Sequence, residues 1–580
     1  MMLRRKILGV FLLYAFLLPT FVFGQTAPKI YEAPADVIAR IKDEGSKNSQ
    51  VMATLSYLSD VIGPRLTASP GMKRGNEWTR DTLAKWGMQN AHLEAWGPFG
   101  RGWTLKRFYA MVDGPTAFPM IAYPKAWSPG TDTLITAPPV DPKAKKSKIP
   151  PAPANPSTAF TGEVVHFNAT NEAELDGYKG KLKGKIVLVG AIRDLKAHFD
   201  PEGKRLTDKE LLDLADAPDP ANVRRSPGGA QNPAFANFQQ QQKFNANRLR
   251  FLVEEGAAIL IDGARGDGGT IFVQQAAAVQ PAAAGASAPA PVRLYDKGAN
   301  IPIQVSAAAE HFNRVARMVD AGEKVTMTVD LAVEYQDQDL NGYNTVAEIP
   351  GSDLKDEIVM LGGHLDSWQG GTGATDNGAG CAVMMEAVRI LKTLGLQPRR
   401  TIRIALWTGE EQGLLGSRAY VKQHFGYLGD GTTPAFGGGG GGGANRPPQK
   451  LTKLPEYDKL SAYFNIDNGT GKIRGVYMQG NDNVRPIFRT WLAPFKEMGA
   501  DTLTLSNTGG TDHLSFDAIG LPGFQFIQDE IEYNQRTHHS NMDVFDRIQG
   551  DDMKQMAIIL ATFVYQTAMM DDKMPRKPRP

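Results

Sequence analysis

The sequence predicts an α/β protein with a mostly parallel, mixed central sheet flanked by helices, and with a second, β-rich region inserted into it. Four short apolar runs typical of buried strands alternate with helical stretches in the C-terminal half: "DEIVMLGG", "TIRIALWTG", "KLSAYFNIDNG" and "LPGFQFIQD". One helical stretch, residues 380–394, places Met384, Val388 and Leu391 on a single face. At 580 residues the chain is too long for one ordinary core, so we expect two or three domains.

Residues 1–24 are predicted to be a secretory signal peptide. A basic cluster at residues 4–6 precedes an apolar stretch at residues 7–23, and Gly24 is a small residue at the expected cleavage site. A membrane anchor is the alternative, but Pro19 and the modest length of the stretch argue against it, because a spanning helix needs about 20 apolar residues. We therefore expect an exported protein, periplasmic or secreted, with no membrane attachment after cleavage.

Charge and cysteine content restrict the partners and the compartment. The formal net charge is +2, and subtracting the three basic residues of the signal peptide leaves −1. A nearly neutral chain has no broad basic face, so nucleic acid is not an expected partner. Cys381 is the only cysteine, so no intramolecular disulfide can form. A disulfide-free exported protein suits a bacterial periplasm or exterior.

The rest of the chain is predicted to divide between two domains. Residues 25–114 form the first part of the larger domain and begin with helical patterns. Residues 115–335 form the inserted β-rich domain, in which "GKIVLVGAI" and "GAAILIDGA" are apolar runs bounded by glycine. Residues 336–570 complete the larger domain, and residues 571–580 are predicted to be a disordered tail.

Three segments are expected to be loops that add nothing to a core. Residues 143–156 and 276–291 are low-complexity stretches rich in alanine and proline. Seven consecutive glycines at residues 437–443 cannot order a loop by packing, so they predict a surface insertion.

Potential metal ligands follow three of the predicted strands. His364 follows "IVMLGG", Glu410 and Glu411 follow "TIRIALWTG", and Asp467 follows "SAYFNI". In open α/β sheets, sites form beyond the carboxyl ends of the strands, so these side chains are expected to converge on one crevice. Each residue alone has an ordinary explanation, such as a turn, a helix start or a surface pair. Those explanations do not account for the placement of the whole set.

With Asp376 and His539 from nearby loops, the set contains enough ligands for two zinc ions. Zinc binds imidazole nitrogen and carboxylate oxygen, and two zinc ions about 3.5–4 Å apart can share a bridging carboxylate. The side chains of Glu410 and Glu411 diverge because the residues are adjacent, so one can bind metal while the other reaches the water. Asp366 is placed to accept the second ring N–H of His364, two residues before it.

Five motifs, in this order, resemble those of the co-catalytic dizinc exopeptidases: "GGHLDSW", "TDNGAG", "WTGEEQGLLGS", "NIDNGTG" and "HHSNMD". That family includes bacterial leucyl-type aminopeptidases, glutamate carboxypeptidase II and carboxypeptidase Q, and the stretch at residues 58–103 makes the carboxypeptidase Q group the most similar. "GKLKGKIVLVGA" and "FLVEEGAAILIDGA" resemble the protease-associated domain that is common in the family. The resemblance covers nearly all of the mature chain except the poly-glycine and Ala/Pro loops.

The resemblance implies two zinc ions and a role for each ligand. His364 and Asp467 bind one ion, Glu411 and His539 bind the other, and the carboxylate of Asp376 bridges both.

The resemblance also assigns the residues around the ligands. Glu410 is the implied general base, and Asp366 is grouped with it as a catalytic residue. His538 stands where many relatives have a tyrosine that helps hold the tetrahedral intermediate. His539 is preferred to it as a ligand because the family's ligand directly precedes a serine or threonine, as it does here. His513 is assigned a role beside the substrate or behind the ligands.

The function predicted in this way is that of an exported zinc metallo-exopeptidase acting on dipeptides or short peptides from a free terminus, as an aminopeptidase, carboxypeptidase or dipeptidase. A metal-dependent amidase or acyl-amino-acid hydrolase with the same zinc pair is the alternative. A catalytically inactive, peptidase-like binding module is a third possibility, disfavoured because every expected ligand is present. Peptide substrate is the expected partner, and the resemblance also allows for a homodimer.

Overall fold

The computed structural model describes residues 29–135, 158–223, 233–281, 291–431, 449–467 and 469–577, with backbone alone for residues 233–235. The predicted signal peptide, the loop at residues 143–156, most of the loop at residues 276–291 and the poly-glycine segment lie outside these ranges. Within them, no helix has the length and apolar character needed to cross a membrane.

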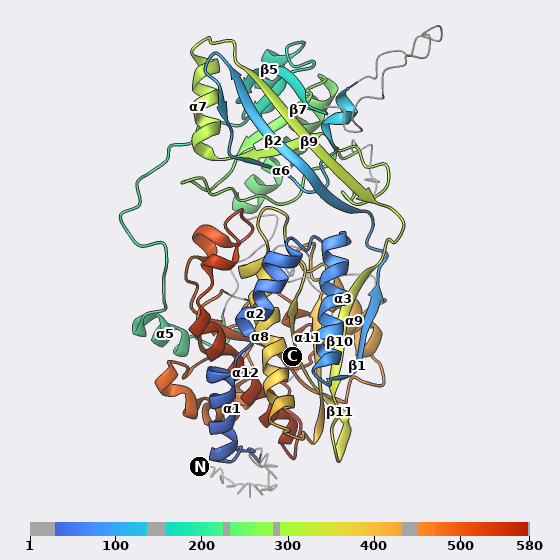
Figure 1. Cartoon of the computed structure of the whole chain (residues 1–580), viewed down its shortest axis with the longest axis vertical. Coiled ribbons are helices and arrows are strands. Elements are labelled where there is room, and N and C mark those ends of the chain that lie inside the picture. Colours follow the sequence, from blue (N-terminus) through green and yellow to red (C-terminus); the bar gives the residue numbers. More distant parts are fainter. Residues whose placement is uncertain are drawn as a thin grey trace, which may run out of the picture.

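An eight-stranded mixed sheet forms the larger, lower part of the molecule, as the sequence predicts (Figure 1). Its centre is parallel, because β11 pairs in parallel with β12 and β15, and β15 pairs in parallel with β18. The pairings β1–β10, β10–β12 and β18–β16 are antiparallel, and β16–β17 is parallel. In spatial order the strands are β1 (Gln89–Trp96), β10 (Gly342–Ile349), β12 (Arg400–Trp407), β11 (Leu354–His364), β15 (Leu460–Asn465), β18 (Gly523–Gln528), β16 (Ile473–Tyr477) and β17 (Thr502–Thr504).

Helices cover both faces of this sheet, and alternate residues of its strands point to opposite cores. On β11, Val359 and Leu361 belong to one core, and Ile358 and Met360 belong to the other. The first core is closed by α1 (Ala35–Lys47), α2 (Val51–Ser56), α3 (Pro70–Lys85), α8 (Ala379–Thr393), α10 (Arg485–Leu492) and α12 (Gly550–Met569). The second is closed by α9 (Leu415–His424) and α11 (His513–Asp517). The helix predicted at residues 380–394 is α8, which is buried over most of its length.

A second eight-stranded sheet lies above the first (Figure 1). Its order is β3 (Phe118–Pro119), β2 (Gly102–Gly114), β9 (Thr326–Gln336), β5 (Phe160–Phe167), β6 (Ile186–Val189), β7 (Ile259–Gly263), β8 (Ile303–Ala307) and β4 (Ala122–Pro124). Two longer helices, α6 (Pro233–Glu254) and α7 (Ala309–Asp320), contribute to its cores, and α4 (Glu172–Leu175) is a single turn. We call residues 102–336 the second-sheet region.

The boundary predicted at residue 115 is wrong for this sheet, because β2 pairs with β9 along nearly its whole length and so belongs to the second sheet from Gly102 onward. A further departure concerns α5 (Asp208–Ala215), which falls within the predicted insert but packs against β17 of the first sheet. Arg205, just before α5, forms ion pairs with the buried carboxylates of Asp529 and Asp552 at 2.9 and 2.8 Å. The chain therefore crosses from the second-sheet region to the first sheet at this point, as Figure 1 shows at its left edge.

The predicted disordered tail at residues 571–580 is ordered over residues 571–577. Met574 is 2% exposed, and its backbone N–H donates to the Ser461 hydroxyl at 3.0 Å. Asp571 pairs with Lys29 and Arg399, both at 2.7 Å. The charge-rich composition suggested disorder, but one buried methionine and these ion pairs hold the segment on the first sheet.

Met574→Ala is expected to lower the free energy of unfolding by about 2–5 kcal/mol, because it leaves a cavity where a buried side chain was. Denaturant titration of the two proteins measures this difference. The control is Asp572→Ala, an exposed neighbour, which should stay within about 0.5 kcal/mol of the parent. If both variants unfold like the parent, the segment does not dock on the sheet in solution.

A charged network joins the end of α9 to β1. His424 Nε2 lies 2.8 Å from Glu94 Oε1, and its Nδ1 lies 3.5 Å from Glu456 Oε2. Burial disfavours the charged imidazolium, but the two glutamates outweigh it and raise the pKa of His424 to about 9.

After α9, the short strands β13 (Gly426–Leu428) and β14 (Leu451–Lys453) pair with each other as a separate two-stranded sheet.

Because the pKa of His424 is raised on folding, its contribution to stability is complete below the unfolded-state value of about 6.5 and is lost as the pH rises through about 9. We therefore expect the parent to lose more stability than His424→Gln between about pH 7 and about pH 10. Melting temperatures of both proteins across this range test the expectation. If the melting temperatures of the two proteins change with pH in parallel, the His424 imidazolium adds no stability.

Candidate metal centre

The predicted ligands meet at the carboxyl ends of the parallel strands. His364 is the last residue of β11, Glu410 and Glu411 follow β12, and Asp467 follows β15. Asp376 lies in the turn η4 (Ala374–Gly378), directly before α8, and the two adjacent histidines follow the turn η7 (Tyr533–Thr537). The parallel register that places β11 between β12 and β15 is what brings these distant segments together.

Asp376 stands between two separate groups of side chains. Its Oδ1 lies 3.2 Å from His364 Nε2, and that nitrogen is 3.5 Å from Asp467 Oδ1. Its Oδ2 lies 3.2 Å from His539 Nε2, and that nitrogen is 3.0 Å from Glu411 Oε2. Each oxygen of one carboxylate thus faces its own histidine–carboxylate pair, which is the arrangement that two ions sharing a bridge require.

Burial and charge set the protonation of this group. Burial alone would raise the pKa of Asp376, but the neighbouring His364 and His539 rings hold it well below its usual range. Burial likewise disfavours a charged His539, yet the carboxylates of Glu411 and Asp376 raise its pKa to about 10. Burial raises the pKa of Glu411 to about 7 and that of Glu410 well above its ordinary value. The group concentrates more carboxylates than its histidines can neutralise, which favours cations.

The residues present fit a pair of zinc ions. Asp376 Oδ2 and Glu411 Oε1 are buried and accept no hydrogen bond from the described residues. Buried carboxylate oxygens without donors are costly unless a cation binds them. The donor set is imidazole nitrogen and carboxylate oxygen, and neither cysteine nor amide takes part, which suits zinc at a catalytic centre.

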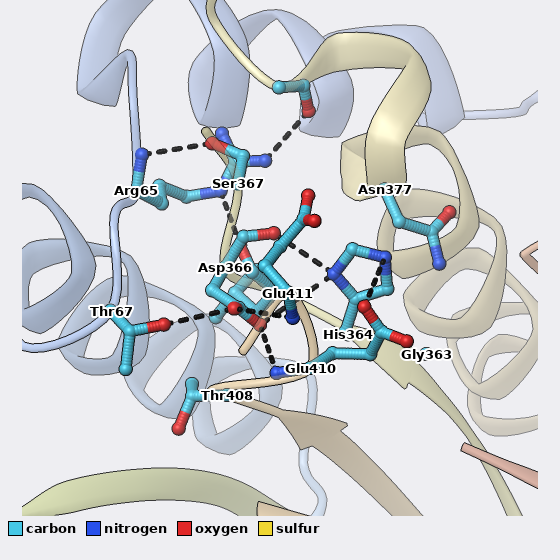
Figure 2. Close-up of polar contacts among 12 residues, drawn as sticks. Arg65, Thr67, Gly363, His364, Asp366, Ser367, Asn377, Thr408, Glu410 and Glu411 are labelled. Carbon is cyan, nitrogen blue, oxygen red and sulfur yellow. Dashed lines mark hydrogen bonds and ion pairs between the residues drawn. The ribbon is translucent and has the colours of Figure 1, made fainter. Parts of the chain in front are cut away.

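Asp366 is close to His364, but its carboxylate does not act as predicted. His364 Nδ1 lies 3.0 Å from the backbone carbonyl of Asp366 and 3.6 Å from its carboxylate. The carboxylate instead accepts the backbone N–H groups of Glu410 and Glu411, at 3.2 and 3.3 Å, and the hydroxyl of Thr67 at 2.9 Å (Figure 2). The backbone carbonyl is thus the group that orients His364, while the Asp366 side chain fixes the segment that carries both glutamates.

The two histidines that are not proposed as ligands, His538 and His513, differ in position. His538 Nε2 lies 3.6 Å from Asp376 Oδ2, and its ring centroid is 3.6 Å from that of His539, so it borders the centre while its side chain stays 31% exposed. His513 is fully buried, its Nε2 lies 3.2 Å from the Thr508 carbonyl, and burial lowers its pKa to about 4. Its burial does not fit a role beside the substrate.

Sequence reasoning missed Arg65, which holds the ligand loops from behind. Its guanidinium is fully buried and donates to the carbonyls of Leu365, Thr372 and Gly373 at 2.7, 2.9 and 2.7 Å. These carbonyls lie next to His364 and just before the turn that carries Asp376. Arg65 lies in "LSDVIGPRLTASPG", a segment that supplies none of the predicted metal ligands, so the ligand pattern did not single it out.

Several known proteins resemble this chain in sequence. Residues 344–564 match the sequence profile described as "Peptidase family M28". Carboxypeptidase Q of Mus musculus is 31% identical over 268 residues, which is 46% of this chain and 50% of that protein. Carboxypeptidase Q of Bos taurus is 24% identical over 550 residues, which is 94% of this chain and 91% of that protein. The match to the mouse protein therefore spans about half of its length, whereas the weaker bovine match spans most of it.

A solved structure shares the fold. The crystal structure of a peptidase M28 precursor from Shewanella amazonensis superposes with a TM-score of 0.59 at 20% identity, covering 94% of this chain and 99% of that one. The segment that matches the family profile contains all of the converging ligands, from His364 to His539. Residues 344–564 of this chain therefore match the sequence profile of peptidase family M28, and the chain shares its fold with a peptidase M28 precursor.

Proposed function

We propose that this protein is an exported dizinc exopeptidase that hydrolyses dipeptides or short peptides from a free terminus. The observation that carries the proposal is the position of Asp376, whose two oxygens face two separate histidine–carboxylate pairs. The match of residues 344–564 to the profile of a peptidase family supports peptide-bond hydrolysis as the reaction. Export is proposed from the features of residues 1–24, and the second-sheet region is proposed to be the protease-associated-type insert.

The ligands would hold one ion between His364, Asp467 and Asp376, and the other between Glu411, His539 and Asp376. Zinc at these positions supplies Lewis acidity and a water of lowered pKa.

The protein's own contribution to proton transfer is Glu410. Its Oε2 lies 4.0 Å from His364 Nε2, and its backbone N–H is fixed by Asp366, so its carboxylate is held at the edge of the ligand group. Burial raises the pKa of Glu410, which makes the ionised side chain a stronger base. In this position it takes a proton from the attacking water and returns it to the leaving amine.

The test is an assay of the purified protein on a panel of unblocked dipeptides, N-terminally blocked and C-terminally amidated dipeptides, and N-acyl amino acids. Exopeptidase action requires turnover of unblocked dipeptides, loss of turnover on chelation and recovery on zinc addition. The blocked substrates show which terminus must be free. Preferential turnover of N-acyl amino acids would make the protein an acyl-amino-acid hydrolase, and zinc binding without any turnover would make it a binding module.

A further inference from the structure

A segment of the second-sheet region runs directly beside the loop that carries His539. The backbone N–H of Val273 donates to the His539 carbonyl at 2.9 Å, and the backbone N–H of Asn541 donates to the Ile271 carbonyl at 3.1 Å. The Asn541 side-chain oxygen also accepts the Ile271 N–H at 2.7 Å. These contacts form a short antiparallel ladder between two segments that are about 270 residues apart in sequence.

The ladder holds His539 in an unusual backbone conformation. His539 has φ of +62°, in the left-handed region that non-glycine residues rarely adopt. Such conformations persist where the surroundings over-determine them, and they concentrate at functional sites. Here the bond from Val273 fixes the His539 carbonyl, so the second-sheet region determines how this histidine presents its ring.

The same segment also contacts the ring itself. The side-chain amide of Gln274 lies 2.9 Å from His539 Nδ1, while Nε2 on the other side of the ring faces Asp376 and Glu411. The backbone of Gln274 is fixed in turn, because its carbonyl accepts the Ala126 N–H at 3.0 Å and the Gln369 side-chain amide at 3.1 Å. Gln274 is therefore held against the outer nitrogen of a candidate ligand.

We infer that Gln274 is a positioning residue that sets the tautomer of His539 and thereby completes one of the two zinc sites. If Nε2 binds zinc, Nδ1 must carry the proton and needs an acceptor. In this structure the amide nitrogen of Gln274 is the atom that faces His539 Nδ1. A rotation of the amide group by 180° places its oxygen there instead, because the two orientations have nearly the same shape. The zinc centre is then built by both parts of the molecule. This inference rests on the proposed function.

Zinc affinity, measured without substrate, tests the inference. The protein is equilibrated in buffers of fixed free zinc, and bound zinc per chain is measured by mass spectrometry. Gln274→Ala is expected to weaken one of the two sites about tenfold or more and to leave the other unchanged, because loss of an outer hydrogen-bond partner typically costs 10- to 100-fold in metal affinity. Gln274→Glu, which restores an acceptor, is expected to recover the lost affinity.

Gln275→Ala is the matched control, because Gln275 is the adjacent exposed glutamine and has no contact with His539 among the described interactions. Equal melting temperatures of the zinc-free proteins show that the substitutions leave the fold intact. The inference is overturned if Gln274→Ala binds both ions with the parent's affinity, if both sites weaken equally, or if Gln275→Ala has the same effect. A parent that binds fewer than two ions would instead contradict the proposed function.

Discussion

Glu410→Gln is expected to retain both zinc ions and to lose most turnover, by about 10²- to 10⁴-fold in kcat. The substitution keeps the size and the backbone contact to Asp366 but removes the ionisable group at the edge of the ligand cluster. Because Glu410 is not one of the proposed ligands, zinc content should not fall. The measurement is kcat on an unblocked dipeptide together with zinc per chain.

Measuring kcat and zinc content together distinguishes a general base from a metal ligand. The control is Glu497→Gln, which changes an exposed glutamate between α10 and β17 and should match the parent in both measurements. A Glu410→Gln variant that loses zinc would make Glu410 a ligand, and one that hydrolyses dipeptides at the parent's rate would remove it from proton transfer altogether.

The positions of the ligands followed from the sequence because they depend on local patterns. An apolar run that ends in His364, or in Glu410 and Glu411, marks the carboxyl end of a strand, and parallel strands present those ends at one edge. The fold class followed for the same reason. The helix α8 could also be predicted from the sequence, since its apolar residues recur at helical spacing.

Other features depend on contacts between distant segments, which composition does not reveal. Residues 571–577 have the composition of a free tail, yet Met574 is buried. β2 belongs to the second sheet because of its register with β9, and no signal within Gly102–Gly114 specifies that partner. The same limit applies to Asp366, whose carboxylate has two backbone donors in reach that become neighbours only in the folded chain.

Asp376→Ala is expected to abolish binding of the zinc pair, because the two oxygens of this carboxylate face the two histidine–carboxylate pairs. At a free-zinc level about 100-fold above the dissociation constant, each bound ion stabilises the folded protein by about 2.7 kcal/mol. The parent should therefore gain stability from two ions, and Asp376→Ala should lose nearly all of that gain. Zinc per chain and the zinc-dependent rise in melting temperature measure the two quantities.

Asp467→Ala and Glu411→Ala are the matched comparisons, since Asp467 pairs with His364 at 3.5 Å and Glu411 pairs with His539 at 3.0 Å. Each is expected to lose one ion and to retain the other with reduced affinity. If Asp376→Ala also retained one ion with an affinity equal to that of these variants, its carboxylate would serve a single ion. The two halves of the centre would then bind zinc independently, and the proximity of His364 and His539 to the same side chain would reflect packing rather than a shared ligand.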